Sequence, residues 1–163
     1  YTADENAFYD EGYVVASTPM VLDIQAIQFL YGARPYNIGD DIYSFSDASP
    51  FSLTLWDTDG VDTLDLSNFS SNLEVNLNEG EYSTIPTINW SMQDNLGIAH
   101  GTLLENLTGG AGNDVLIGNS LDNVISGGSG SDTLTGGLGA DTFVFYLSEL
   151  GELADNMILD FVS

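Results

Sequence analysis

The apolar residues of this chain follow two periods, a helical one near the N-terminus and a strand-like one over the remainder. The helical run has apolar residues three or four positions apart: Val21, Ile24, Ile27, Leu30 and Tyr31. Thr18 and Pro19 suit the N-cap and the first position of a helix, and Gly32 suits its end. The pattern predicts one helix over residues 19–31, after an irregular segment at residues 1–16.

From Ile42 onward, apolar and polar positions alternate, which is typical of strands. The runs with this period are residues 42–45, 51–56, 63–66 and 73–77. Asp, Gly, Asn and Ser residues separate them, and we expect these four strands to pair in antiparallel fashion. Near the C-terminus, residues 147–153 are compatible with a short helical turn and residues 157–161 with another strand.

A nine-residue unit repeats four times without a gap between Gly109 and Val144. The units read GGAGNDVLI, GNSLDNVIS, GGSGSDTLT and GGLGADTFV. Three of them fit the pattern G-G-x-G-x-D-x-U-x, in which U is a large apolar residue. The second unit is degenerate but keeps its apolar residue in phase. This pattern resembles the nonapeptide repeat of calcium-binding parallel β-helices.

Each unit divides into a turn of six residues and a strand of three. Glycines allow the turn to adopt positive φ angles, so it is sharp and leaves carbonyl oxygens pointing inward. The middle residue of each strand is expected to face the core: Leu116, Ile125, Leu134 and Phe143. Two units make one coil of 18 residues, so turn 109–114 should stack on 127–132, and 118–123 on 136–141.

This stacking brings Asp114 near Asp132, and Asp122 or Asn123 near Asp141. Such carboxylates repel each other, and facing carbonyls lack donors, but Ca²⁺ surrounded by six to eight oxygens removes both problems. Plain glycine-rich turns are the alternative, and three motifs in phase favour calcium. The further candidate ligands in these turns are Gly109, Gly110, Ala111, Gly112, Gly118, Gly127, Gly128, Ser129, Gly130, Gly136, Gly137 and Gly139.

The strong negative charge of the chain limits the kinds of molecule that it can bind. The chain has 25 acidic residues against one basic residue, Arg34, and a net charge of −24, which disfavours nucleic acids and anionic membranes. A solvated acidic surface, as in salt-tolerant secreted proteins, is the alternative to cation binding. The acids are mostly Asp in turns, which favours cations. Cysteine is absent, which excludes a disulfide framework, and every apolar run is too short to insert into a membrane.

A second acidic loop, residues 57–62, groups three carboxylates around Gly60: Asp57, Asp59 and Asp62. It is not an EF-hand, because the glycine stands at position four and Asn68 at position twelve. A simple Asx-type turn is the alternative. A similar acidic loop at residues 37–41 precedes it by about twenty residues. If the two loops meet, they form an oxygen cage that clamps the helix end to the sheet.

The segment PMVLDIQAIQFLYGA resembles the helix that follows the catalytic site in metzincin-type zinc proteases. Three later segments resemble the C-terminal region of the serralysins, bacterial secreted zinc endopeptidases with a calcium-bound β-roll: WDTDGVDTLDLSNF, VNLNEGEYS and IAHGTLLENLTGGAGNDVLIGN. The resemblance implies a mainly β fold, in which antiparallel strands and one helix from the protease-domain boundary precede a calcium-binding parallel β-roll. It implies the tail end of a metalloprotease-type domain at residues 1–36. Residues 37–163 would form a β-sandwich/β-roll RTX domain, truncated at its C-terminus.

The resemblance also assigns site residues. The calcium site matched by Asp57, Gly60 and Asp62, with Asp59 in place of the usual glycine, is completed by the earlier loop through Asn37, Gly39 and Asp41. Glu105 matches the acid that joins Gly110, Gly112 and Asp114 in the first site of the roll. Leu103 stands where the family often has threonine and would bind through its carbonyl oxygen.

Tyr1 has the spacing of the family's Met-turn tyrosine, which lies beside the zinc; a terminal aromatic residue without a role is the alternative. The zinc motif H-E-x-x-H-x-x-G-x-x-H is missing. His100 is the only histidine and is expected to be structural or exposed, because one histidine without cysteine cannot build a three-ligand zinc site. Zn²⁺ would therefore belong to an upstream catalytic domain, and this chain alone is not expected to be catalytic.

The sequence thus favours a non-catalytic calcium-binding RTX domain of a secreted, extracellular serralysin-like zinc endopeptidase. It would bind several calcium ions and fold on binding them after export by type I secretion machinery, and it would support secretion and stability of the protease. The alternative is a calcium-dependent RTX module of an adhesin, toxin or lipase. A glycosidase with paired carboxylates is a third hypothesis, which no particular pair of acids supports.

Overall fold

The computed structural model describes residues 16–146 and 155–160 of the chain. Tyr1 and almost all of the irregular segment predicted before the helix lie outside the described residues. The helical turn predicted at residues 147–153 also lies outside them, and so does the last residue of the strand predicted at 157–161.

One helix, α1 (Val21–Tyr31), precedes a series of strands of two or three residues in the described part of the chain. These strands are β1 (Ile42–Ser44), β2 (Leu53–Leu55), β3 (Thr63–Asp65), β4 (Glu74–Asn76), β5 (Tyr82–Ser83), β6 (Leu96–Ile98), β7 (Asn106–Thr108), β8 (Val115–Ile117), β9 (Val124–Ser126), β10 (Thr133–Thr135), β11 (Thr142–Val144) and β12 (Met157–Ile158).

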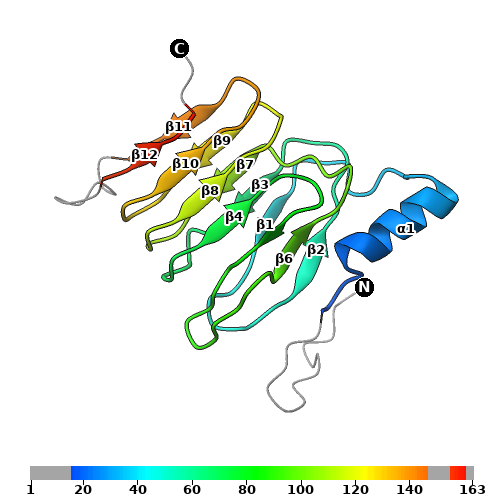
Figure 1. Cartoon of the computed structure of the whole chain (residues 1–163), viewed down its shortest axis with the longest axis horizontal. Helices are drawn as coiled ribbons and strands as arrows, with labels where there is room; N and C mark the ends of the chain where they lie inside the picture. The colour runs from blue at the N-terminus through cyan, green and yellow to red at the C-terminus, as the bar shows by residue number, and fades with distance from the viewer. Residues whose placement is uncertain (1–15, 147–154, 161–163) are drawn as a thin grey trace.

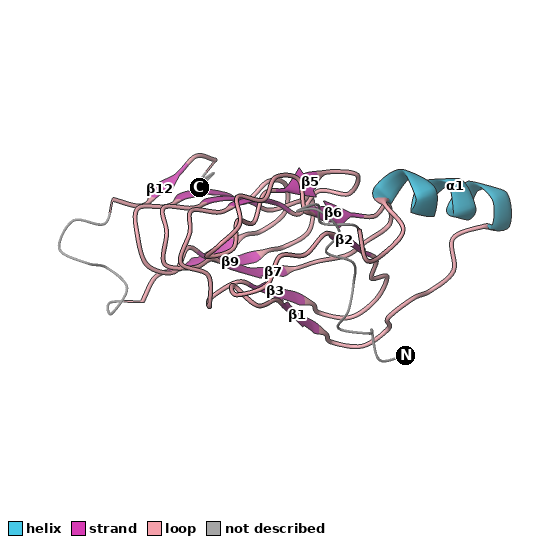
Figure 2. Ribbon diagram, turned by 90° about the horizontal axis from the view of Figure 1, so that it is seen from below, coloured by secondary structure: helices cyan, strands magenta, loops and turns pink. Residues whose placement is uncertain are grey.

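The strands form a roll with two parallel sheets, and from β7 to β12 the chain passes alternately through them. One sheet has the order β1-β3-β7-β9-β11 and the other β12-β10-β8-β4, while β2, β6 and β5 form a third sheet. Figure 1 shows the successive coils side by side, and Figure 2 shows α1 at the end of the molecule opposite β12. The predicted fold class, mainly β with a parallel roll and one helix, is confirmed.

The coil of 18 residues is confirmed by the strand register. Leu116 in β8 lies opposite Leu134 in β10, and Ile125 in β9 lies opposite Phe143 in β11. The three aligned aliphatic residues Leu116, Ile125 and Leu134 are fully buried between the sheets, as predicted. Phe143 is only partly buried, because β11 is the outer strand of its sheet.

The antiparallel pairing expected for the strands between residues 42 and 77 is wrong. All four strands exist, but β1 pairs with β3, β2 with β6, β3 with β7 and β4 with β8, each in parallel. The links between them are longer than hairpin loops and carry the chain to the opposite sheet, so consecutive strands are not neighbours. Antiparallel pairing among the described strands occurs between β5 and β6.

The helix begins two residues later than predicted, and Thr18 is not its N-cap. The Thr18 hydroxyl oxygen instead accepts the Thr54 N–H at 2.7 Å, and the Asp23 carboxylate accepts the Met20 N–H at 3.2 Å. Gly32, with a φ of 80°, ends the helix as predicted. No helix in the described residues is long and apolar enough to cross a membrane.

Helix α1 contacts the roll through a narrow face. Val21 and Ile24 are buried, and a Cβ on Gly97 in β6 would lie 2.8 Å from Val21 Cγ2, so the contact requires a glycine at that position. Gln28 Nε2 donates to the His100 carbonyl oxygen at 2.9 Å. Ile27, Leu30 and Tyr31, which share the predicted helical period, are exposed.

We expect Leu116→Ala to destabilise the roll by about 2–5 kcal/mol, because it opens a cavity at a fully buried position in a core only one side chain deep per strand. The neighbouring Val115→Ala is the matched control, since Val115 is 40% exposed on the outer face of the same strand. Urea denaturation in excess calcium measures both free energies of unfolding. Equal losses for the two variants would contradict the inward orientation of Leu116.

Candidate functional site

The turns that precede the strands of each sheet lie above one another in two columns. The first stack consists of residues 36–41, 57–62, 101–105, 118–123 and 136–141. The second stack consists of residues 66–73, 109–114, 127–132 and 155–156. The predicted stacking of 109–114 on 127–132, and of 118–123 on 136–141, is confirmed by backbone hydrogen bonds from Ser129 N to Gly110 O and from Leu138 N to Asn119 O.

In the second stack, each acidic side chain contacts the backbone of the preceding coil. The Asp114 carboxylate accepts the N–H groups of Leu73 at 2.8 Å and Gly110 at 2.9 Å. The Asp132 carboxylate accepts the Asp114 N–H at 3.0 Å, and the Asn156 side-chain oxygen accepts the Asp132 N–H at 2.7 Å. The column therefore holds Asp114 and Asp132 one above the other.

The first stack repeats this arrangement. The Asp62 carboxylate accepts the Asp41 N–H at 2.8 Å, and the Glu105 carboxylate accepts the Asp62 N–H at 2.9 Å. Further along, the Asp141 carboxylate accepts the Asn123 N–H at 3.0 Å. The predicted proximity of Asn123 and Asp141 is confirmed. The contact between Glu105 and Asp62 was not predicted.

Burial makes the charged form of Asp114 unfavourable. The side chain is almost completely buried, and this burial, with a contribution from the charge of Asp132, raises the pKa of Asp114 to about 6. The N–H groups of Gly110 and Leu73 oppose the rise without cancelling it. These donors are neutral, so a cation at this position would stabilise the carboxylate much more than they do.

Glycines allow the turns of the second stack to approach closely. Gly128 and Gly130 have φ angles of 84° and 115°, and a Cβ on either would lie 2.1 Å from the carbonyl oxygen of Gly110 or Gly112 respectively. No other residue fits both the backbone conformation and the space. The glycines of the motif therefore hold carbonyl oxygens of one turn against the backbone of the next.

The two acidic loops at residues 37–41 and 57–62 meet, as predicted. The Asp40 carboxylate accepts the Val61 N–H at 2.9 Å. One carboxylate oxygen from each of Asp41, Asp57 and Asp62 lies within 4.8 Å of the other two. We call these three residues the aspartate cluster. Asp59 is exposed and lies outside it.

Asp62 is the buried centre of the aspartate cluster. Its side chain is fully buried, and its Oδ2 atom has no hydrogen-bond partner among the described residues. Burial raises the pKa of Asp62 to about 6, and the charges of Asp57, Glu105 and Asp41 add to this rise. An unpartnered carboxylate oxygen beside two further carboxylates matches the oxygen ligands that calcium prefers.

Tyr43 was missed by the sequence analysis. Its hydroxyl donates to Asp57 Oδ2 at 2.5 Å and accepts a hydrogen bond from Asn37 Nδ2 at 2.7 Å. Burial, together with the hydrogen bond to Asp57, raises the pKa of the Tyr43 hydroxyl above its ordinary value, so it remains a donor. Tyr43 therefore holds one carboxylate of the aspartate cluster in place, and it links Asn37 to that cluster through its own hydroxyl.

The expected grouping of Glu105 with Gly110, Gly112 and Asp114 is wrong. Glu105 belongs to the first stack, where its carbonyl oxygen accepts the Val124 N–H at 3.0 Å, whereas Asp114 belongs to the second. The chain crosses from one sheet to the other between β7 and β8, which separates the two acids. Leu103 lies in the same turn as Glu105, and its N–H donates to the Asp57 carbonyl oxygen at 3.0 Å.

Two residues near the C-terminus also join the turns. Asn156 occupies the position above Asp132, and Asp160 accepts the N–H groups of Gly136 at 2.9 Å and Gly137 at 2.7 Å. No nonapeptide motif marks this segment, but Asn156 directly precedes a predicted strand, as the acids of the repeats do. Asp122 is exposed, and its carboxylate accepts the Ala140 N–H of the next coil at 2.7 Å.

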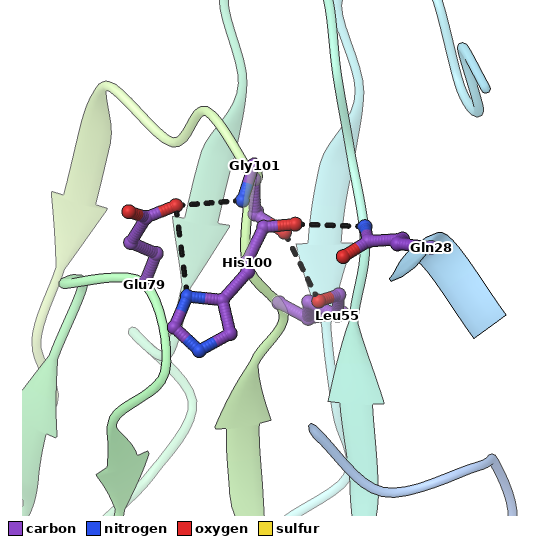
Figure 3. A network of polar contacts seen from close by, with 6 residues as sticks. Gln28, Leu55, Glu79, His100 and Gly101 are labelled. Atoms are coloured by element: carbon purple, nitrogen blue, oxygen red, sulfur yellow. Dashed lines mark hydrogen bonds and ion pairs between the residues drawn. The ribbon is translucent and has the colours of Figure 1, made fainter. Parts of the chain in front are cut away.

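His100 has a structural position, as expected. Figure 3 shows its ring beside Glu79, with 3.9 Å between Nδ1 and Glu79 Oε2. The same Glu79 oxygen accepts the Gly101 N–H at 2.7 Å, while the His100 carbonyl oxygen accepts from Gln28 of helix α1. A Cβ on Gly80 would lie 2.8 Å from the ring, so the imidazole packs directly on that glycine. His100 thus links three segments of the fold.

Comparison with known proteins agrees with this architecture. The sequence model of the family described as peptidase M10 serralysin C terminal matches residues 22–163. Serralysin from Photorhabdus luminescens is 39% identical over 132 residues, covering 73% of this chain and 26% of that protein. Serralysin C from Dickeya chrysanthemi is 41% identical over 128 residues, covering 71% and 25%. Metalloprotease AprA from Pseudomonas entomophila is 41% identical over 123 residues, covering 68% and 24%.

The chain spans about a quarter of the length of these relatives. The match to the family covers every strand of the roll and all but the first residue of helix α1. The chain therefore belongs to the peptidase M10 serralysin C-terminal family and represents the C-terminal region of a serralysin-like protease.

Proposed function

We propose that this chain is the non-catalytic, calcium-binding part of a secreted serralysin-like zinc endopeptidase, and that calcium completes its fold after export. The observation that carries the proposal is the burial of Asp62 and Asp114, each beside further carboxylates and each bonded only to neutral donors. The ion pair between His100 and Glu79 involves neither Asp62 nor Asp114, so it does not neutralise these two carboxylates. A bound cation would supply the positive charge that stabilises these buried carboxylates.

The residues fit calcium better than other common metal ions. The aspartate cluster and the acids Asp114 and Asp132 offer oxygen atoms only, and the glycine turns add carbonyl oxygens at close range. Calcium takes six to eight such ligands in flexible geometry, whereas zinc prefers nitrogen and sulfur ligands and magnesium demands a strict octahedron. In this proposal, each ion bridges two consecutive turns of a stack.

Calcium would make folding depend on whether the chain is inside or outside the cell. Without the ion, the fold must bury carboxylates that repel each other, and this lowers the stability of the stacked turns. The sites barely exist in the unfolded chain, so the free energy of calcium binding becomes free energy of folding. Extracellular modules bind calcium with dissociation constants of about 10⁻⁴–10⁻³ M, too weak for the low calcium inside cells. The acidic turns would thus stay unstacked during export by a type I secretion machinery and complete the fold outside.

Helix α1 supports the proposal of an upstream protease domain. The residues Leu22, Ala26 and Phe29 form an apolar stripe opposite the face that contacts the roll. Leu22 is 71% exposed and Phe29 is 89% exposed. We propose that residues 1–36 complete the metalloprotease-type domain, which covers this stripe and holds the zinc. The family assignment favours this proposal over a module of an adhesin, toxin or lipase.

Removal of calcium is expected to abolish most of the strand signal of the roll, because the acids in the stacked turns then repel each other. Circular dichroism of the purified chain before and after dialysis against a chelator measures this loss. Calcium at about 10⁻³ M should restore the spectrum, and the same concentration of magnesium should not. A spectrum that is identical with and without chelator would contradict the proposed coupling.

Asp132→Asn is expected to weaken calcium binding more than Asp122→Asn, although both changes remove one negative charge. Asp132 is buried in a complete motif between Asp114 and Asn156, whereas Asp122 is exposed at the edge of its turn. Isothermal titration with calcium gives both affinities, and we expect a loss of at least about tenfold for Asp132→Asn. Equal losses would mean that net charge, and not the stacked carboxylate, attracts the ion.

The raised pKa values of Asp62 and Asp114 predict opposite effects of pH with and without calcium. Both values lie near 6 against 3.8 in the unfolded chain, so the folded protein binds more protons in this window. Stability of the calcium-free protein should therefore fall as pH rises through 4 to 6. Calcium must displace these protons, so its affinity should fall as pH drops below about 6.

Circular dichroism in chelator across this pH range measures how much strand structure the calcium-free chain keeps and tests the first effect, and calcium titration tests the second. Asp114→Asn should flatten the calcium-free pH dependence, because its amide does not titrate. An unchanged profile in this variant would show that Asp114 does not contribute to the pH effect.

A further inference from the structure

The turn at residues 118–123 differs from the other nonapeptide turns in its chemistry. It reads Gly-Asn-Ser-Leu-Asp-Asn, so asparagine replaces the second glycine of the motif and also the acid. Both side chains, Asn119 and Asn123, are buried. A buried amide must satisfy its donors as well as its acceptor, whereas a carboxylate has acceptors only.

The orientation of both amides follows from their backbone partners. The Asn123 side-chain oxygen accepts the Asn119 N–H at 2.9 Å, and the Asn119 side-chain oxygen accepts the Leu121 N–H at 2.9 Å. A reversed amide would place NH₂ donors against these N–H groups. The Nδ2 atoms of both residues must therefore point the other way.

The Nδ2 atoms point to the turn of the preceding coil. Asn119 Nδ2 donates to the Leu104 carbonyl oxygen at 2.8 Å. Asn123 Nδ2 donates to the Glu105 carbonyl oxygen at 3.0 Å and to the Leu104 carbonyl oxygen at 3.2 Å. These direct hydrogen bonds join turn 118–123 to turn 101–105 without any charged group of Asn123.

Asn123 presents a hydrogen-bond donor to the preceding coil, whereas the acids at the equivalent positions present an acceptor. Asp114 and Asp132 face the preceding coil with a carboxylate oxygen, which accepts a backbone N–H. Asn123 faces the preceding coil with an NH₂ donor. The Glu105 carbonyl oxygen accepts both this donor and the Val124 N–H, so its two lone pairs are used. A cation placed beside the NH₂ group would be repelled.

We propose that the side chains of Asn119 and Asn123 replace a calcium ion between turns 101–105 and 118–123. These two stacked turns, one level of the roll, are then held together by hydrogen bonds without metal. Turns 101–105 and 118–123 then form a calcium-independent junction, which joins the aspartate cluster to the nonapeptide repeats through strands β7 and β9. This removes Leu103, Gly118 and Asn123 as calcium ligands at that level. The inference rests on the proposed calcium binding at the other turns.

The junction should retain order when calcium is removed. Hydrogen–deuterium exchange of the whole chain in chelator, followed by peptide mass spectrometry, compares the junction with the repeats. We expect peptides that cover residues 104–108 and 122–126 to exchange at least about tenfold more slowly than peptides that cover 128–135. Calcium should slow exchange strongly in the repeats and much less in the junction.

Asn123→Asp converts the donor into an acceptor with almost no change of shape. It should abolish the protection of the junction in chelator, calcium should restore it, and isothermal titration should detect one more bound ion than in the unmodified chain. Asn89→Asp is the matched control, because Asn89 is exposed and the charge change is the same. The control should leave both the exchange pattern and the number of bound ions unchanged.

Two results would overturn the inference: equal dependence of junction and repeats on calcium in the unmodified chain, or an Asn123→Asp variant that keeps its protection in chelator. Should that variant fail to fold even with calcium, the exchange of the unmodified chain decides alone. Failure of the proposed function looks different, because the unmodified chain would then bind no calcium at any turn.

Discussion

The burial of carboxylates beside one another in neighbouring coils is the constraint on which this roll depends. Each coil adds an acid whose side chain contacts the backbone of the preceding coil, and the acids Asp62 and Asp114 are buried as a result. The geometry satisfies backbone N–H groups well, but it leaves negative charge in a place from which water is excluded. The same contact therefore orders the turns and makes their stability depend on whatever neutralises the acids.

The core is built from few residues per strand. Most strands of the two parallel sheets contribute one inward aliphatic side chain, such as Leu64, Leu107 or Ile125, and residues of the turns, such as Leu66 and Phe69, complete the core. Glycines with positive φ lie so close to the carbonyl oxygens of the neighbouring turn that a side chain at these positions would clash with them. The turns also contribute to the order of the fold, through backbone hydrogen bonds from each turn to the turn stacked on it.

The two columns of turns do not depend on the same chemistry at every level. Carboxylates dominate around Asp62 and between Asp114 and Asp132, while Asn119 and Asn123 join two turns by neutral hydrogen bonds. At the aspartate cluster a neutral group also contributes. Tyr43 of β1 packs against the core, and its hydroxyl donates a hydrogen bond that positions the Asp57 carboxylate. On our proposal, one substitution at a repeated position changes a pair of stacked turns from ion-dependent to ion-independent.

Local chemistry was sufficient for the body of the helix, for the strands between residues 42 and 77 and in the repeats, and for the coil of 18 residues, because turn geometry and side-chain alternation act between residues close in the chain. It did not predict β5 and β6. It was also sufficient to pair Asp114 with Asp132, one full coil apart. It failed for the parallel pairing of β1 to β4 and for the partner of Glu105, which contacts Asp62 across 43 residues. Those partners depend on which sheet the chain enters after each turn, and that choice follows from packing of the whole roll.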